Sequence, residues 1–317
     1  TFADGPFSFS VAVSAGARVG SNGLVFEAIR DVNPILYINT GDFFYADIDE
    51  NKIDRFRDQL RRALTRPAQA ALYEAGPIAY IWDDHDYGPD NSDRTSPARD
   101  AARAAYREIV PHYELPAGQN DGAIYQAFTI GRVRFLLTDM RSEREPPTTD
   151  GTARSMLGAR QKAWLKEELL SASKTYPVIV WVSSVPWIAE PNPEGDSWNA
   201  FPEERQELAD FIADNEIDSI VMIGGDAHMV AIDDGSNSDY ATGGGAAFPL
   251  LQAAALDRRG SAKGGPYSEG AYPGSGQFGL LTVDDDGGES IAITLQGLNW
   301  TGAEIVSYGF ELPAPSP

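Results

Sequence analysis

Short apolar runs alternate with amphipathic stretches along most of the chain. Residues 7–13 (FSFSVAV) alternate large apolar with small residues, which predicts a first β-strand. Residues 34–38 and 77–82 are short, largely apolar runs of the kind that form strands buried on both faces. Between these two runs, residues 51–74 place apolar side chains at roughly helical spacing, and Pro67 interrupts them, which predicts a broken helix.

The alternation continues through the middle of the chain and changes near its end. Further helices are predicted at residues 24–30, 96–110, 157–171 and 202–215, and further strands at residues 123–130, 132–138, 178–182 and 219–223. The last stretch predicts only strands, at residues 279–283, 291–295 and 304–310. Because strands that alternate with helices form a sheet covered on both faces, we expect one α/β domain over residues 1–317 with a β-rich C-terminal tail. Residues 243–276 are rich in Gly, Ala and Pro and predict a long loop or lid.

Polar side chains follow three of the predicted strands at the point where each strand ends. Asp42 and Tyr45 follow the second strand, Asp84 and His85 follow the third, and Asp226 and His228 follow the strand at residues 219–223. Ligands of open α/β sheets bind at the carboxyl ends of the strands. Carboxylate and phenol oxygens suit hard cations. Taken alone, Asp42 is more typical of a turn residue that caps a helix.

The distribution of histidine strengthens the case for a metal or catalytic site. The chain has three His residues. His85 and His228 lie beside the acidic clusters, whereas His112 follows a helix and looks ordinary. A single His is usually a hydrogen-bonded structural residue, but two of three beside Asp at strand ends favour chemistry. The set is typical of metal-assisted hydrolysis, in which cations grip a phosphoryl oxygen and activate a water while a His donates a proton to the leaving oxygen.

Charge narrows the range of partners. The 317 residues carry a formal net charge of -22, and the pI is near 4.4. Such a surface repels nucleic acids and anionic lipids, so we expect a small-molecule substrate and no nucleic-acid-binding surface. An anionic substrate then needs a local positive centre, which a polyvalent cation would provide.

Several site types are excluded by composition. The chain has no Cys, which excludes disulfides, thiolate catalysis and Cys-based metal sites. No apolar run reaches the length of about 18 residues that a membrane span needs. The chain begins at Thr1 without an initiator Met or a leader, so we expect a processed or trimmed form. If a signal was removed, the protein is secreted or periplasmic. The oligomeric state is not predicted.

An ordered set of motifs resembles a known family. GDFFYAD at residues 41–47, WDDHD at residues 82–86 and GGDAH at residues 224–228 are similar, in that order, to the PhoD-like alkaline phosphatase/phosphodiesterase group of the calcineurin-like metallophosphoesterases. Three further segments agree: ARVGSN, DMRSER, and LGARQKAWL together with GDSWNAFPEER. The resemblance covers roughly residues 7–230 and implies a four-layer αββα sandwich with metals at the strand ends.

The resemblance also implies roles for individual residues. The implied metal ligands are Asp42 as the bridging carboxylate, Tyr45 as a phenolate on Fe(III), Asp84, Asp226 and His228. His85 would be the acid that contacts the phosphate. Arg141 would contact the phosphate too, although an ordinary surface ion pair with Glu143 or another acid is an equal alternative. The implied cofactor is Fe(III) with calcium, and the implied activity is hydrolysis of phosphomonoesters or phosphodiesters by metal-activated water or hydroxide.

One position departs from the family pattern. Gly16 stands just before ARVGSN, where PhoD-like enzymes usually have Cys, so the thiolate ligand is missing. Three alternatives to the full iron–calcium cluster follow: fewer metals, different metals such as zinc or manganese, or iron with water in the vacant position. Two other functions stay open. The first is hydrolysis of an organophosphate triester or a phosphonate, because a neutral triester is not repelled by a protein with a net charge of -22. The second is non-catalytic binding of metal or phosphate.

Overall fold

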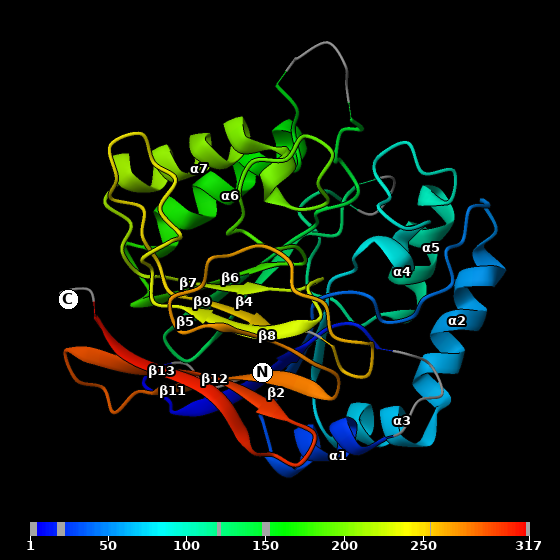
Figure 1. Cartoon of the computed structure of the whole chain (residues 1–317), viewed down its shortest axis with the longest axis horizontal. Helices are drawn as coiled ribbons and strands as arrows, with labels where there is room; N and C mark the ends of the chain where they lie inside the picture. The colour runs from blue at the N-terminus through cyan, green and yellow to red at the C-terminus, as the bar shows by residue number, and fades with distance from the viewer. Residues whose placement is uncertain (1–4, 18–22, 119–121, 148–152, 254, 315–317) are drawn as a thin grey trace.

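The chain folds into two β-sheets that pack face to face, with helices on both outer faces (Figure 1). The computed structural model describes residues 5–17, 23–118, 122–147, 153–253 and 255–314. The layers follow one another as helices, sheet, sheet and helices, which confirms the αββα sandwich expected from the resemblance.

The first sheet joins the two ends of the chain. Its strand order is β13-β12-β11-β1-β2-β3, with β1 (Phe9–Ser14), β2 (Leu36–Asn39), β3 (Ile78–Tyr80), β11 (Gln277–Asp284), β12 (Ser290–Asn299) and β13 (Glu304–Pro313). Strands β1, β2 and β3 run parallel, and β11 pairs antiparallel with β1, with Val11 opposite Leu281. The C-terminal tail is therefore part of the first sheet.

The second sheet contains strands that the sequence pattern did not predict. Its order is β10-β8-β9-β7-β6-β5-β4, with β4 (Gln126–Ile130), β5 (Val133–Thr138), β6 (Val178–Ser183), β7 (Ile220–Gly224), β8 (Met229–Asp233), β9 (Leu250–Ala253) and β10 (Ala271–Pro273). Strands β9 and β10 lie within residues 243–276, so this segment is not one continuous loop. Its strands escaped prediction because four- and three-residue runs are too short to show a period.

Alternate residues of the central strands face different layers. In β1, Val11 and Val13 belong to the core between the sheets, whereas Ala12 faces the outer helices. In β6, Val180 faces the other sheet and Trp181 faces the helices on the opposite side. Successive side chains of a strand point to opposite faces, so each sheet seals two cores at once. Burying each such side chain contributes about 1.5–3 kcal/mol.

The helices cover the outer faces in pairs. Helices α1 (Leu24–Asp31) and α3 (Pro67–Ala75) cover the first sheet, and α6 (Gly158–Ala172) and α7 (Pro202–Asp214) cover the second. A further group, α2 (Ile53–Thr65), α4 (Asp84–Tyr87) and α5 (Arg99–Ile109), lies to the right of the sheets in Figure 1.

The predicted break between helices is confirmed. Helix α2 ends at Thr65 and α3 begins with Pro67 in its first position, where a proline costs no hydrogen bond. None of the helices in the described ranges is both long and apolar enough to cross a lipid bilayer.

Candidate metal centre

The predicted site residues follow the carboxyl ends of parallel strands. Asp42 follows β2, Asp84 follows β3, and Asp226 follows β7. The chain segments after these strands touch one another. A Cβ on Gly41 would lie 2.4 Å from the Cβ of Asp83, and one on Gly225, which follows β7, would lie 2.8 Å from the backbone oxygen of Thr40, which follows β2. Only glycine allows this approach, so the strand ends of both sheets meet at one place.

Two of the acidic residues have an uncommon backbone conformation. Asp42 has φ 54° and Asp226 has φ 61°. This left-handed region is uncommon for residues other than glycine, and Asp is among those that enter it. The two residues turn the chain sharply after the strand, and both are buried.

Asp42, Tyr45 and His228 form one connected group. The Tyr45 hydroxyl donates to Asp42 Oδ2 at 2.6 Å and lies 3.1 Å from His228 Nε2. Burial, together with the charges of Asp84 and Asp83, raises the pKa of Asp42 well above its usual range. Burial and the Asp42 charge also raise the pKa of Tyr45, so the phenol keeps its proton unless a cation replaces it.

The orientation of His228 suits a metal ligand. Its Nδ1 lies 3.0 Å from the carbonyl oxygen of Arg259, which fixes Nδ1 as the donor and leaves the lone pair on Nε2. Burial lowers the pKa of His228 to about 4, so the imidazole is neutral at neutral pH. A neutral imidazole with a fixed tautomer is the form that binds metals.

Asp84 is held as a carboxylate. Its Oδ1 accepts from the backbone N–H of His85 at 3.0 Å, and its Oδ2 accepts from the backbone N–H of Asn91 at 2.6 Å. Burial raises the pKa of Asp84, but the charges of Arg141 and His85 and the hydrogen bond from Asn91 outweigh it, and the pKa falls to about 2. Asp84 is thus the most strongly ionised carboxylate of those whose pKa shifts at this site.

Asp226 is paired with a cation that the sequence analysis did not identify. The Lys263 ammonium lies 2.5 Å from Asp226 Oδ1. Burial raises the pKa of Asp226 to about 6, against the opposing effect of Lys263. Arg258 comes from the same stretch of chain, and its guanidinium carbon lies 3.8 Å from the centre of the Tyr45 ring.

His85 lies beside the group and is oriented by an acid. Its Nδ1 is 2.6 Å from Asp47 Oδ1, and its Nε2 is 3.4 Å from Asp90 Oδ1. The imidazole packs on the Tyr45 ring, with 4.3 Å between the ring centres. One ring nitrogen of His85 and one oxygen each of Asp42 and Asp84 all lie within 4.8 Å of one another. His85 is therefore close enough to act on whatever these carboxylates bind.

Arg141 lies in the interior and forms ion pairs with acids there. It is fully buried, with 0% exposure, which excludes a surface ion pair. Its Nε donates to Asp83 Oδ1 at 2.7 Å, and its two terminal nitrogens donate to the carboxylate of Asp196 at 2.7 and 2.9 Å. Since its donors are bound by these acids, the geometry favours a positioning role in which Arg141 fixes the acidic loops around the site.

At this site, three buried carboxylate oxygens are left available. Among the described residues, Asp42 Oδ1, Asp83 Oδ2 and Asp226 Oδ2 have no hydrogen-bond partner. A buried polar atom without a partner is costly, and converging anionic oxygens repel one another as well. A polyvalent cation removes both costs, so the donor set of carboxylates, phenol and imidazole fits a metal centre.

Sequence reasoning missed several residues of this site. Lys263 and Arg258 lie in a Gly-rich stretch with no motif, so no local signal indicated them. Asp83 precedes Asp84 in WDDHD, and Asp196 lies in the GDSWNA segment, so both could have been found there. The ARVGSN segment is only partly open to comparison, because its residues 18–22 lie outside the described residues.

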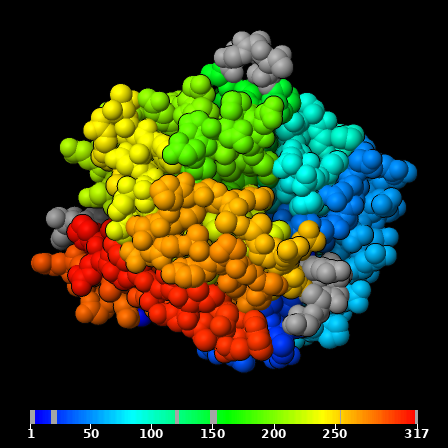
Figure 2. Space-filling view, in the orientation of Figure 1, coloured from blue at the N-terminus to red at the C-terminus, as the bar shows by residue number. Residues whose placement is uncertain are grey.

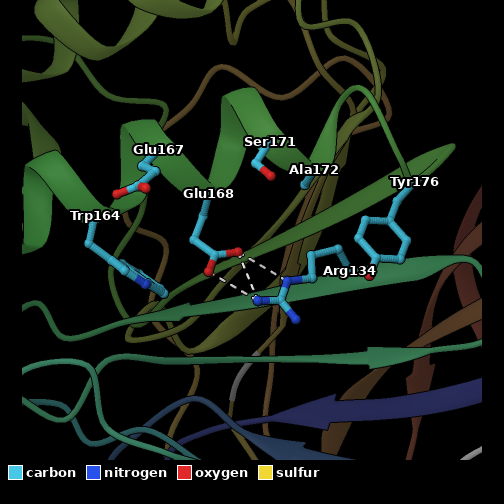
Figure 3. A pocket seen from close by; sticks show the side chains of 7 residues that line it. All are labelled: Arg134, Trp164, Glu167, Glu168, Ser171, Ala172 and Tyr176. Carbon is cyan, nitrogen blue, oxygen red and sulfur yellow. Dashed lines mark hydrogen bonds and ion pairs between the residues drawn. The ribbon is translucent and has the colours of Figure 1, made fainter.

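A cavity in another part of the protein is a weaker candidate for the functional site. It measures about 380 Å³ and lies between α6 and β5 (Figure 3). Its Arg134 donates to both oxygens of Glu168, at 2.9 and 3.0 Å, so the guanidinium is already neutralised. Arg134 is the second residue of β5, near the opposite end of that strand from Asp139 and Arg141.

Comparisons with known proteins identify the family of this chain. A model of the PhoD-like phosphatase family matches residues 11–263. Alkaline phosphatase D from Bacillus subtilis (strain 168) is 27% identical over 187 residues, which cover 50% of this chain and 32% of the relative. The chain thus spans about a third of the length of the curated relative that it matches.

Solved structures share the fold at low identity. A structure of PhoD matches with a TM-score of 0.75 and 17% identity, covering 98% of this chain and 71% of that chain. The purple acid phosphatase PPD1 from yellow lupin (Lupinus luteus) seeds gives 0.61 at 13% identity, with coverage of 96% and 54%. A dimetal phosphatase from Danio rerio gives 0.55 at 14% identity, with coverage of 96% and 99%.

Proposed function

Because the chain belongs to the PhoD-like phosphatase family, we propose that it is a metal-dependent phosphoric ester hydrolase. The observation that carries this proposal is the set of buried oxygens of Asp42, Asp83 and Asp226 that have no partner in the described part of the chain, beside Tyr45 and His228. A protein keeps such an unfavourable cluster where a function requires it. The proposed ligands are Asp42, Tyr45, Asp84, Asp226 and His228.

The chain's own residues divide the work between binding and proton transfer. When bound, cations would polarise a phosphoryl oxygen and lower the pKa of a water molecule. Asp42 lies between the groups after β3 and β7, which supports its assignment as the ligand that two ions would share. Asp47 holds the His85 ring in place through Nδ1, and we assign His85 the contact with the phosphate and proton donation to the leaving oxygen.

For the metals we propose Fe(III) with calcium, with zinc or manganese as the alternative. Hard oxygen donors and a phenol favour Fe(III) and calcium. Gly16 bears on the choice, because a Cβ there would lie 3.5 Å from both Tyr45 Oη and His228 Cδ2. A side chain at this position would face Tyr45 and His228, so a Cys there would supply a further ligand that Gly16 does not, and water would take its place.

The proposed substrates are small phosphomonoesters or phosphodiesters. Oxygen-rich sites that hold two cations are suited to charged phosphoryl oxygens, which the ions bind and neutralise. A triester or phosphonate substrate, and binding without turnover, are the alternatives that the experiment below separates. Secretion or export to the periplasm stays a prediction.

The test is hydrolysis of aryl phosphates by metal-loaded protein. Wild type and the Asp42→Asn variant are assayed with an aryl phosphomonoester, phosphodiester and phosphotriester that share one leaving group. We expect hydrolysis of the monoester or diester. The rate should fall by at least about 100-fold in the variant, because removing a residue that only hydrogen-bonds to a metal ligand already costs up to about 100-fold. Turnover of the triester alone would favour the second activity. Absence of turnover on all three, with Asp42→Asn identical to wild type, would refute the proposal.

A further inference from the structure

Lys263 brings a positive charge into the proposed metal centre. Its ammonium lies 2.5 Å from Asp226 Oδ1, while the other oxygen of that carboxylate, Oδ2, is one of the buried atoms without a described partner. Asp226 can therefore hold Lys263 with one oxygen and an ion with the other. The two interactions do not compete for the same atom.

The segment that carries Lys263 is fixed to the rest of the site by its backbone. The N–H of Gly265 donates to the carbonyl oxygen of Ile188 at 2.8 Å, and the Tyr267 hydroxyl donates to the carbonyl oxygen of Lys263 at 3.2 Å. Gly264 has φ +74°, and a Cβ on it would lie 2.3 Å from the same carbonyl of Ile188. A side chain at 264 would push the segment away, so this glycine holds Lys263 close to the carboxylates.

Lys263 also lies on the open side of the centre. Its side chain is 44% exposed, whereas Asp226 is 5% exposed, so the ammonium stands between the buried acid and solvent. Figure 2 shows the orange stretch of chain that includes residues 255–275 spread over the middle of this face. Arg258, against Tyr45, comes from the same stretch. The protein therefore places two cations beside the site although its formal net charge is -22.

We propose that Lys263 binds a charged non-bridging oxygen of the substrate and sets the preference among phosphate esters. This inference rests on the proposed hydrolase function. Lys263 is held by Asp226 through one oxygen and has three N–H donors, so two remain for a substrate that enters from solvent. A side chain placed in this way contacts the substrate and is a specificity-determining residue.

The charge of the substrate decides how much this contact contributes. A phosphomonoester dianion has two negative charges on its non-bridging oxygens, a phosphodiester has one, and a triester has none. An ammonium attracts the first most strongly and the third hardly at all. Lys263 thus favours the monoester over the diester, and the diester over the triester.

The experiment compares neutral and charged replacements of Lys263. Lys263→Met and Lys263→Gln remove the charge, and Lys263→Arg keeps it. Lys166→Met is the matched control, because Lys166 pairs with the exposed Glu207 on the helix layer and its loss changes the net charge equally. Each protein is loaded with metal, its metal content is measured, and kcat and KM are determined for the three aryl esters. The dissociation constant of inorganic phosphate is measured by calorimetry.

The expected result is a graded loss. Lys263→Met and Lys263→Gln lower kcat/KM for the monoester by about 10- to 100-fold, the range of a hydrogen bond to a charged group, and weaken phosphate binding by a similar factor. The loss is smaller for the diester and within about 3-fold of wild type for the triester. Lys263→Arg and Lys166→Met stay near wild type, and metal content is unchanged in all.

Three outcomes would overturn the inference. Equal losses on all three esters, or unchanged phosphate binding, would mean that Lys263 does not contact a charged oxygen. Loss of metal in the neutral variants would assign Lys263 to holding the centre together instead. If wild type hydrolyses no ester, the proposed function fails, and the phosphate affinities of the same proteins still decide whether Lys263 binds a phosphoryl oxygen.

Discussion

Single residues at this site show how one side chain can be placed by another that does not itself react. Asp47 is exposed, yet its carboxylate lies 2.6 Å from His85 Nδ1. A hydrogen bond at Nδ1 fixes the tautomer and the ring orientation and directs Nε2 for its task. The function of Asp47 is thus to position His85 above the carboxylates.

We predict that Asp47→Asn lowers kcat by about 10- to 100-fold with little change in KM, as expected for loss of a group that orients a catalytic imidazole. Asn adopts the positive φ of 45° at this position as readily as Asp does, so the backbone is kept. Steady-state kinetics of the metal-loaded protein measure the effect. Asp49→Asn, two residues further along the chain, is the control, and equal kcat in both variants would show that Asp47 has no part in the reaction.

The sequence predicted the metal-binding side chains better than the residues that surround them. Asp42, Asp84 and Asp226 each come within a few residues of the end of an apolar run, so their place at a strand end could be inferred. Lys263 is brought to Asp226 by tertiary packing across 37 positions of sequence, and no local pattern encodes that contact. The buried setting of Arg141 depends in the same way on Asp196, 55 positions away.

At the scale of elements, the segments that follow the strands determine the geometry of the site. Gly41 lies two residues after the end of β2, and its φ of +110° turns the chain toward Asp83. β3 leads into Asp83 and α4, and the Asp86 carboxylate accepts from the N–H of Phe43 at 3.0 Å. These contacts bind the segment after β2 to the segment after β3, and so hold Asp42 beside Asp84.

We predict that Gly41→Ala destabilises the protein by at least about 3 kcal/mol, a cost reserved for severe steric conflict. The new Cβ would lie 2.6 Å from the backbone nitrogen of Asp83, which cannot move without opening the site. Gly302→Ala is the matched control, with φ +76° and no atom within 4 Å of its Cβ, and should cost about 1–2 kcal/mol. Denaturant unfolding measures both, and equal losses would mean that the segments after β2 and β3 are not tightly packed.

The limits of sequence reasoning also differ between elements. Strands β1, β6 and β7 were predictable because several consecutive apolar residues lie between two cores. β8 follows His228 directly and was not predicted, and the carboxylate of its Asp233 is buried and accepts from the N–H of Gly235. Strands of this kind are defined by their neighbours in the sheet and not by their own pattern.

At the scale of the whole molecule, this acidic protein gathers several buried carboxylates at the candidate metal centre. In the absence of metal the charges of these groups oppose folding. Burial raises the pKa values of Asp86 and Asp226 to about 6. A raised folded-state pKa stabilises the protein below the unfolded pKa, and this contribution is lost as pH rises through the folded value.

We therefore predict that the metal-free protein loses this contribution between about pH 4 and pH 7. Asp226→Asn removes one such group, so its stability relative to wild type should increase by about 2 kcal/mol over that range. Urea unfolding of chelator-treated proteins at several pH values measures the difference. A difference that is constant with pH would show that Asp226 is ionised normally in the folded state.

Metal content per chain tests the central claim most directly, since that claim is that distant carboxylates, a phenol and an imidazole meet to hold ions. Elemental analysis compares wild type with Asp42→Asn after identical purification without chelator. We predict at least one equivalent of bound metal in wild type and a clear loss in the variant. Wild-type protein with no metal above background, or equal metal in both, would contradict the claim.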